Sequence, residues 1–272
     1  MEPLRLVVCV KSVSDPRLPA ESTIDPSTGI VRRRADEMGA PRVISPLDRF
    51  ALEEALRIKE DHGGTTVTAL SMDTSAAREA LRESIALGCD QAILLSDASL
   101  AGADTLATAR CLAAAIRQLG AVDLILCGAW SYHGNTGQVG PQLAEVLGIA
   151  HISFATHLEF AEPRTVRVRS EWEGQYALVE AGLPLLITVC GSGHPSRHAS
   201  LMGITRARGV QVIQWGRQDL ALSPDVVGLA GSPSRVTGVS VVKSFRRQEI
   251  LDGDTQVAVR LLVERLRDDA VL

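Results

Sequence analysis

The sequence predicts an α/β fold built on a doubly wound, mostly parallel sheet. Short apolar runs without alternation recur along the chain, and such runs are typical of strands covered on both faces. Amphipathic helical patterns separate the earlier runs, and strand–helix–strand alternation favours a parallel, right-handed sheet. The 272 residues are 46% hydrophobic but only 3% aromatic, which indicates an aliphatic, layered core.

The expected elements follow in order. Strands are expected at 4–10, 65–71, 91–95, 122–127 and 185–190. Helices are expected at 47–59, 75–87 and 104–119, where apolar residues recur every three or four positions. Residues 165–170 alternate apolar with basic side chains, and a second run at 174–180 follows a Glu-Gly turn. We therefore expect an antiparallel hairpin added to the sheet.

The overall charge and the cysteine pattern exclude several classes of protein. A net charge of −4 and a pI near 5.9 provide no basic footprint for nucleic acid. No apolar run reaches membrane-spanning length and no leader opens the chain, so we expect a cytoplasmic protein without direct membrane insertion. Five cysteines without CxxC spacing indicate buried, reduced thiols, and six histidines without HExxH provide no metal site. We find no catalytic constellation.

The segment 128–141 is the strongest ligand-binding candidate because it follows a buried strand and leads into a helix. Small residues let a ligand approach the backbone closely, at Gly128, Gly134, Gly137 and Gly140. Asn135 and Thr136 can cap the helix, whose free N–H groups attract phosphate. Pro141 must lie within the first helical turn, so the helix should begin near Gly137. A nucleotide site is our hypothesis; an ordinary strand-to-helix loop is the alternative.

Beyond residue 190 the pattern weakens. Residues 191–210 show no periodicity, and the remaining chain mixes one short apolar stretch, 210–215, with Pro/Gly/Ser-rich and charged pieces. This tail ends in an amphipathic helix over 255–268. An arm that packs on another surface is our interpretation, and a helix folded back on its own sheet is the alternative.

Four segments in matching order resemble the beta subunit of the electron transfer flavoprotein family over nearly the full length. The first strand ends in Val10-Lys11, and 45–55 resembles the family's Asn-Pro-aromatic-acidic helix start. Residues 82–90 resemble its Arg-x-Ala-Leu-Ala-Met-Gly-Ala-Asp run. Residues 134–141 resemble the Gly-Asp-Thr-Ala-Gln-Val-Gly-Pro form of its nucleotide loop.

The resemblance implies a heterodimer with an alpha subunit, which holds most of the redox FAD, while the beta subunit binds AMP structurally. Electrons would pass from a flavin dehydrogenase to this FAD and onward, with no catalytic residue in the beta chain. The implied fold is Rossmann-like, of the adenine-nucleotide alpha-hydrolase type. The implied AMP contacts are Cys9, Ser45, Pro46, Leu47, Asp48, Met72, Gly128, Ala129, Trp130, Ser131, Gly134, Asn135, Thr136, Gly137, Gln138 and Val139.

We expect backbone N–H groups at 135–138, with the Thr136 hydroxyl, to bind the phosphate, and Cys9 and Met72 to line the adenine and ribose walls. Ser45–Asp48 should present backbone rather than side chains to the base. Trp130 departs from the family's loop; it either stacks on a base or packs in the core. Ser170 also departs, replacing the arginine that pairs with the glutamate at Glu171 near the flavin.

The family's partner-recognition loop falls on 195–204. Leu201 would insert into a dehydrogenase, while Arg197 and His198 would set specificity. We therefore divide the chain into a nucleotide-binding α/β domain over 1–192, a partner-recognition region over 193–209 and an arm over 210–272 that packs on the alpha subunit. Two alternatives stay open: a bifurcating flavoprotein with a second FAD in place of AMP, and an unpartnered ATP- or AMP-binding module.

Overall fold

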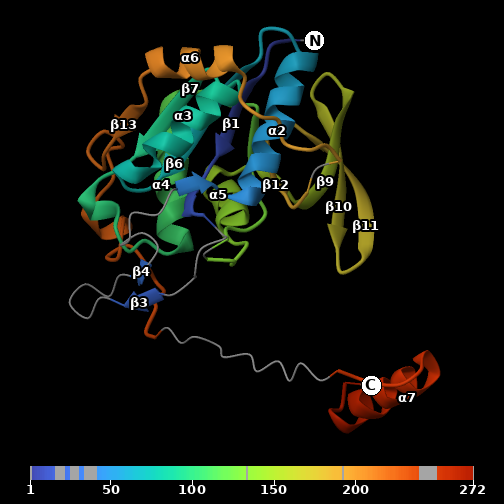
Figure 1. Cartoon of the computed structure of the whole chain (residues 1–272). Helices are drawn as coiled ribbons and strands as arrows, with labels where there is room; N and C mark the ends of the chain where they lie inside the picture. Colours follow the sequence, from blue (N-terminus) through green and yellow to red (C-terminus); the bar gives the residue numbers. More distant parts are fainter. Residues whose placement is uncertain are drawn as a thin grey trace. The chain divides into compact units, whose positions relative to one another are not determined.

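The computed structural model describes residues 2–15, 22–24, 31–33, 42–132, 134–191, 193–238 and 250–271. The chain divides into two units, Met1–Val239 and Ser240–Leu272. The first unit holds the sheet and its covering helices (Figure 1). None of the described helices is both long enough and apolar enough to cross a bilayer.

The main sheet has nine strands in the order β11-β10-β9-β12-β8-β1-β6-β7-β13. Neighbouring strands from β9 to β13 in this order pair in parallel, whereas β10 pairs antiparallel with both β9 and β11. The strands are β1 (Arg5–Cys9), β6 (Thr66–Met72), β7 (Gln91–Leu95), β8 (Leu124–Gly128), β9 (Ala150–Glu162), β10 (Thr165–Trp172), β11 (Gln175–Gly182), β12 (Leu185–Val189) and β13 (Ile213–Trp215). The predicted mostly parallel sheet and its added hairpin are both confirmed; the hairpin stands at the right in Figure 1.

Helices cover both faces of this sheet. The helices of the first unit are α2 (Pro46–Asp61), α3 (Arg78–Leu87), α4 (Thr105–Leu119), α5 (Val139–Leu147) and α6 (Leu201–Gly209), with 3-10 turns η1 (Ser75–Ala77), η2 (Ala98–Leu100) and η3 (Pro224–Val226). Two short antiparallel pairs accompany them: β2 (Ser12–Ser14) with β5 (Arg42–Ile44), and β3 (Ser22–Ile24) with β4 (Val31–Arg33).

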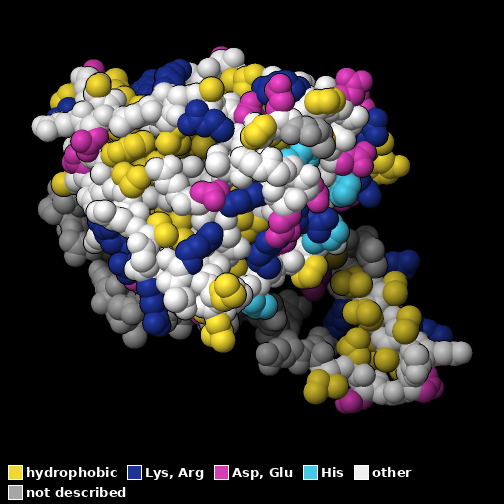
Figure 2. Space-filling view, turned by 90° about the horizontal axis from the view of Figure 1, so that it is seen from above, with side chains coloured by type: hydrophobic (Ala, Val, Ile, Leu, Met, Phe, Trp, Pro, Cys, Tyr) yellow, Lys and Arg dark blue, Asp and Glu magenta, His cyan; other side chains and the backbone are white. Residues whose placement is uncertain are grey.

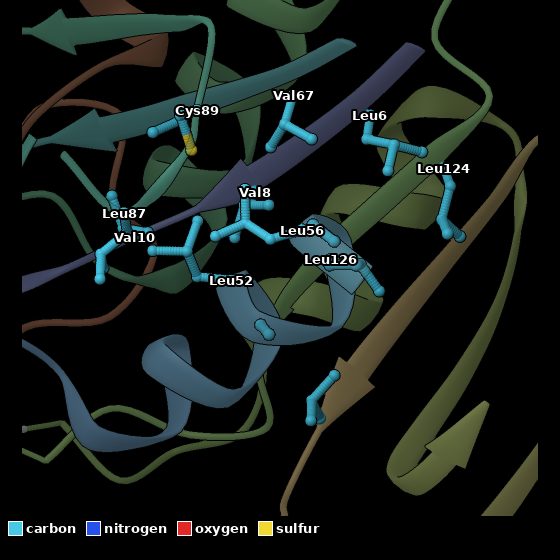
Figure 3. Packing of buried hydrophobic residues seen from close by; sticks show 14 of the residues in the cluster. Leu6, Val8, Val10, Leu52, Leu56, Val67, Leu87, Cys89, Leu124 and Leu126 are labelled. Carbon is cyan, nitrogen blue, oxygen red and sulfur yellow. The ribbon is translucent and has the colours of Figure 1, made fainter. Parts of the chain in front are cut away.

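The core is split in two by the sheet, because successive side chains of a strand point to opposite faces. Leu6 and Val8 of β1 join α2 and α3 in one buried cluster, whereas Val7 joins α4 and α5 in the other. Figure 3 shows Leu52 and Leu56 of α2 close to the side chains of the sheet strands. This two-sided burial explains why β1 reads as a continuous apolar run.

Three elements differ from the sequence-based expectation. Strand β9 was not predicted, because its buried and exposed residues do not alternate regularly and Phe154 interrupts it at φ +59°. Helix α6 occupies residues that were expected to be irregular. Strand β13 has only three residues and joins the sheet by pairing with β7. All three depend on tertiary contacts.

Residues 210–238, assigned from the sequence to an arm, lie within the first unit. The side chain of Val212, just before β13, is buried, as are those of Leu220 and Val227 beyond this strand. The Ser232 hydroxyl accepts the N–H of Asp104, the residue that caps α4. The chain therefore continues to fill the core well beyond residue 210.

The second unit contains α7 (Thr255–Asp268). The Asp254 side chain caps this helix by accepting the N–H groups of Gln256 and Val257. No α7 side chain is buried, and Val259 is 54% exposed and Leu262 46% exposed. Figure 2 shows hydrophobic side chains gathered on this helix. The predicted amphipathic helix is confirmed, and its apolar side chains are exposed.

Candidate functional site

The candidate site lies where β1, β6 and β8 end. The chain runs from β1 to β6 and β7 on one side, and β8 and β12 extend the sheet on the other, so the strand order reverses at β1. Parallel sheets bind ligands outside the carboxyl ends of their strands at such a point. Cys9, Met72 and Gly128 are the last residues of the three strands. The structure thus assembles three separate sequence candidates at one edge.

Asp48, in the first turn of α2, ties two of these strand ends together. Its Oδ2 accepts the N–H of Lys11 at 2.8 Å, and its Oδ1 accepts the N–H of Gly128 at 2.9 Å. A Cβ atom on Gly128 would clash with Oδ1, so this close approach requires glycine. Burial raises the pKa of Asp48 to about 7, although both hydrogen bonds and Lys11 oppose the rise. The carboxylate is committed to the chain's own backbone.

Ser45, the residue before α2, has a hydrogen-bonded backbone and an unsatisfied hydroxyl group. The N–H of Ser45 donates to the carbonyl of Lys11 at 2.9 Å, while its hydroxyl is buried without a hydrogen-bond partner. A buried hydroxyl of this kind is costly to leave unsatisfied. Ser45 therefore places one unpaired polar atom beside the start of α2.

Two thiols border the site. Cys9 and Cys127 are direct partners in the parallel register of β1 and β8, and both belong to the cluster under α4 and α5. Burial, then the nearby Asp48 carboxylate, raises the pKa of Cys9 to about 12. Burial likewise holds the pKa of Cys127 well above its ordinary value. Both therefore present neutral, apolar sulfur rather than a nucleophile, and Met72 packs against the same cluster.

The loop after β8 is exposed and sharply turned. Gly134 and Asn135 donate their N–H groups to the Ser131 hydroxyl and carbonyl, at 3.2 and 2.9 Å. Asn135 and Gly137 adopt positive φ values of 47° and 65°. His133 lies outside the described residues.

Helix α5 begins at Val139, close to the start expected near Gly137, and Pro141 lies in its first turn. The first N–H groups of a helix have no intrahelical acceptor. Those of α5 follow an exposed loop that carries no acidic residue. A Cβ on Gly140 would lie 2.5 Å from Cγ2 of Thr188, so this glycine lets α5 pack closely on the sheet.

Two loop residues have specific contacts. The N–H of Ala129 donates to the Val189 carbonyl at 2.8 Å, which joins the loop to β12. Trp130 is 39% exposed and its ring lies 6.1 Å from that of Phe154. Trp130 is therefore not a core residue. Farther along, Ser170 donates to the Ser153 carbonyl and Glu171 pairs with Arg169 at 2.7 Å.

The segment expected to recognise a partner contains a helix. Leu201 and Met202, its first two residues, are 85% and 84% exposed. The sequence singled out Leu201 but missed Met202, whose exposure follows from the helix that begins here. His198 is exposed, whereas Arg197 is held by Glu53 and Glu60 of α2. Within the described part of the chain, no group of three His, Cys, Asp or Glu side chains could hold a metal.

Comparisons with known proteins agree with this architecture. The family model of the electron transfer flavoprotein domain matches residues 34–219. Electron transfer flavoprotein subunit beta of Clostridium acetobutylicum is 36% identical over 266 residues, covering 98% of this chain and 99% of the relative. Its counterpart from Thermoanaerobacterium thermosaccharolyticum is 37% identical and covers 99% of this chain and 100% of the relative.

A third relative, the caffeyl-CoA reductase-Etf complex subunit CarD of Acetobacterium woodii, is 37% identical over 86% of both chains. Proteins of this family transfer electrons and are not enzymes in their own right. The family match and the full-length similarity, together with the confirmed sheet and hairpin, lead to one conclusion. The chain belongs to the electron transfer flavoprotein family, among its beta subunits.

Proposed function

We propose that this chain pairs with an alpha subunit and binds AMP as a structural nucleotide, in a complex that carries electrons from a flavin dehydrogenase to a downstream acceptor. The observation that carries the nucleotide assignment is the convergence of the β1, β6 and β8 ends with the exposed loop that leads into α5. The redox chemistry would belong to FAD held mainly by the alpha subunit.

The chemistry of these residues fits an adenine nucleotide. Gly134 and Asn135 donate their N–H groups to Ser131, so the backbone N–H groups for a phosphate would come from the loop after Asn135 and from the start of α5. This segment carries no acidic side chain, and the Thr136 hydroxyl adds a donor. Neutral Cys9 and Met72 would form apolar walls for the adenine and ribose. The unpaired Ser45 hydroxyl would gain a partner. Asp48 would act by fixing the backbone rather than by touching the ligand.

A second candidate keeps the site and changes its ligand. In a bifurcating complex a second FAD would replace AMP, and the exposed Trp130 ring offers a surface on which a larger ring system could stack. The third alternative, an unpartnered ATP- or AMP-binding module, gives no role to α7, whose apolar side chains are not covered within its own unit.

Chromatography of released cofactors separates these candidates. The chain is co-expressed with its alpha partner, the complex is denatured, and AMP and FAD are quantified. One FAD with one AMP supports the simple carrier, and two FAD without AMP supports the bifurcating type. A stable monomer loaded with ATP or AMP would support the unpartnered module.

The position of the nucleotide is tested by Thr136→Arg, because an arginine at this exposed loop would fill the space expected for the phosphate. We expect loss of bound AMP and a lower melting temperature, since a ligand stabilises the folded state that binds it. Thr66→Arg, an exposed residue at the opposite end of β6, is the matched control. Full AMP occupancy in Thr136→Arg would place the nucleotide elsewhere.

The alpha-subunit contact is tested by deleting residues 250–272, because a longer deletion from residue 211 would also remove β13 and buried side chains. We expect the truncated chain to fold and to lose co-purification with the alpha subunit. Leu262→Asp should weaken association and Glu264→Gln should leave it intact. Unchanged co-purification of the truncated chain would refute the arm assignment.

The dehydrogenase contact is tested by Leu201→Ala. An exposed apolar anchor is expected to contribute binding energy, so the KM for the reduced dehydrogenase should rise while kcat changes little. Thr205→Ala, an exposed residue on the same helix, is the control. An unchanged KM in Leu201→Ala would remove this residue from the proposed interface.

A further inference from the structure

We propose that Arg197 is a positioning residue, which pins the entry of α6 to α2 through Glu53 and so fixes Leu201 and Met202 in place, rather than a residue that contacts the partner. The inference rests on the proposed recognition role of Leu201. On this view Arg197 does not set partner specificity. It holds in place the start of α6, which carries the exposed Leu201 and Met202.

The hydrogen bonds of Arg197 carry the argument. Oε2 of Glu53 accepts the backbone N–H and the Nε–H of Arg197, both at 2.9 Å, and Oε1 accepts Nη2–H at 2.9 Å. Glu60 accepts from Nη1 at 2.5 Å and from Nη2 at 3.2 Å. Every nitrogen of the guanidinium group is thus engaged within the chain. The added backbone bond means that Glu53 holds the main chain as well as the side chain.

The burial of the two glutamates differs, and this difference assigns them different roles. The Glu53 side chain is 7% exposed, whereas that of Glu60 is 62% exposed. Burial alone would raise the pKa of Glu53, yet the hydrogen bonds and charge of Arg197 lower it below its ordinary value. A buried carboxylate that loses the guanidinium group to which it is hydrogen-bonded is left undercompensated, which is costly. Glu53 is therefore the anchor, and Glu60 adds a solvent-screened contact.

The far end of α6 is held by a separate set of contacts. Nη2 of Arg206 donates to the carbonyls of Ile85 and Cys89, at 2.6 and 3.1 Å, where α3 ends. A Cβ on Gly203 would clash with the Ala86 carbonyl, so the two helices touch backbone to backbone.

Leu201 and Met202 lie between these two attachments, with most of their surface in solvent. Apolar side chains held in place before binding lose less conformational entropy when a partner arrives. The contacts of Arg197 with Glu53 and Glu60, which we call the clamp, would supply the first of the two attachments.

Hydrogen exchange of the full chain, read by mass spectrometry, tests the clamp without knowledge of the partner. Arg197→Gln and Glu53→Gln should each speed exchange of the amides at 197–204 by about tenfold or more, since each breaks the same partly buried pair. The double variant should exchange no faster than the faster single variant. Amides of β1 and β8 should keep their rates, which distinguishes a local change from general destabilisation.

Two further variants sharpen the result. Glu60→Gln should change the exchange rate little, because that contact is exposed. Arg197→Lys should give an intermediate rate, because an ammonium group cannot reproduce the forked contact. Unchanged exchange in Glu53→Gln, or additive effects of the two single variants, would overturn the clamp. If Leu201→Ala leaves the KM for the dehydrogenase unchanged, the recognition role fails while the exchange result still decides the clamp.

Discussion

Asp48→Asn tests whether the ends of β1 and β8 are joined through a buried carboxylate. Both carboxylate oxygens accept backbone N–H groups, from Lys11 at 2.8 Å and from Gly128 at 2.9 Å. Asparagine is nearly isosteric, but it carries one acceptor oxygen and an NH₂ group that cannot accept. The substitution also replaces the titratable carboxyl group with an amide that does not titrate. The pH dependence of stability should therefore change in a defined direction.

The raised pKa of Asp48 determines the direction in which stability changes with pH. Burial raises the pKa of Asp48 from 3.8 to about 7 in the folded chain. The stability that this proton contributes is fully present below pH 3.8 and is lost as the pH rises through about 7. The limiting slope is about 1.4 kcal/mol per pH unit between these values, so about 2–3 kcal/mol separates pH 5 from pH 7. Cys9, with a pKa of about 12, adds no titration in this window.

Urea denaturation at pH 5, 6, 7 and 8 measures the effect. The free energy of unfolding of the natural chain, minus that of Asp48→Asn, should fall from pH 5 to 7 and then level off. Asp61→Asn removes an exposed carboxylate from the same helix and serves as the control. A pH-independent difference for Asp48→Asn would mean that Asp48 does not titrate with a raised pKa in the folded chain. Asp48→Ala at pH 8 should cost about 1–3 kcal/mol for each of the two N–H groups that it leaves without an acceptor.

The remaining predictions concern packing and thiol reactivity. Gly140→Val should lower the free energy of unfolding by about 1–3 kcal/mol, because its Cβ would lie 2.5 Å from Cγ2 of Thr188; chemical denaturation measures this, and an unchanged midpoint would contradict it. Gly203→Ala should loosen α6 from Ala86 and speed proteolysis within α6, with no change if the helices are not in backbone contact. Among the five thiols, Cys190 should be alkylated first under native conditions, because the other four are buried; mass spectrometry of the labelled peptides tests the order.

Local patterns in the sequence were enough to predict the fold class, the positions of the central strands along the chain, the antiparallel hairpin and the position of the glycine-rich loop. These features leave a local pattern, because a strand buried on both faces must be apolar throughout and a strand-to-helix turn needs small residues. The amphipathic pattern of α7 was likewise local. The family resemblance, confirmed by the comparisons, added the electron transfer role to this framework.

Other elements were decided by contacts between distant segments. Strand β13 is only three residues long and needs β7 beside it, and α6 is held by contacts with α3. The Asp48 bond to Gly128 spans 80 residues, and the Arg197 bond to Glu53 spans 144. A hydrogen bond between a carboxylate and an amide that are far apart in the chain produces no periodic pattern in the sequence. Only the folded sheet, which brings the strand ends together and stacks α6 against its neighbours, determines which polar groups must pair.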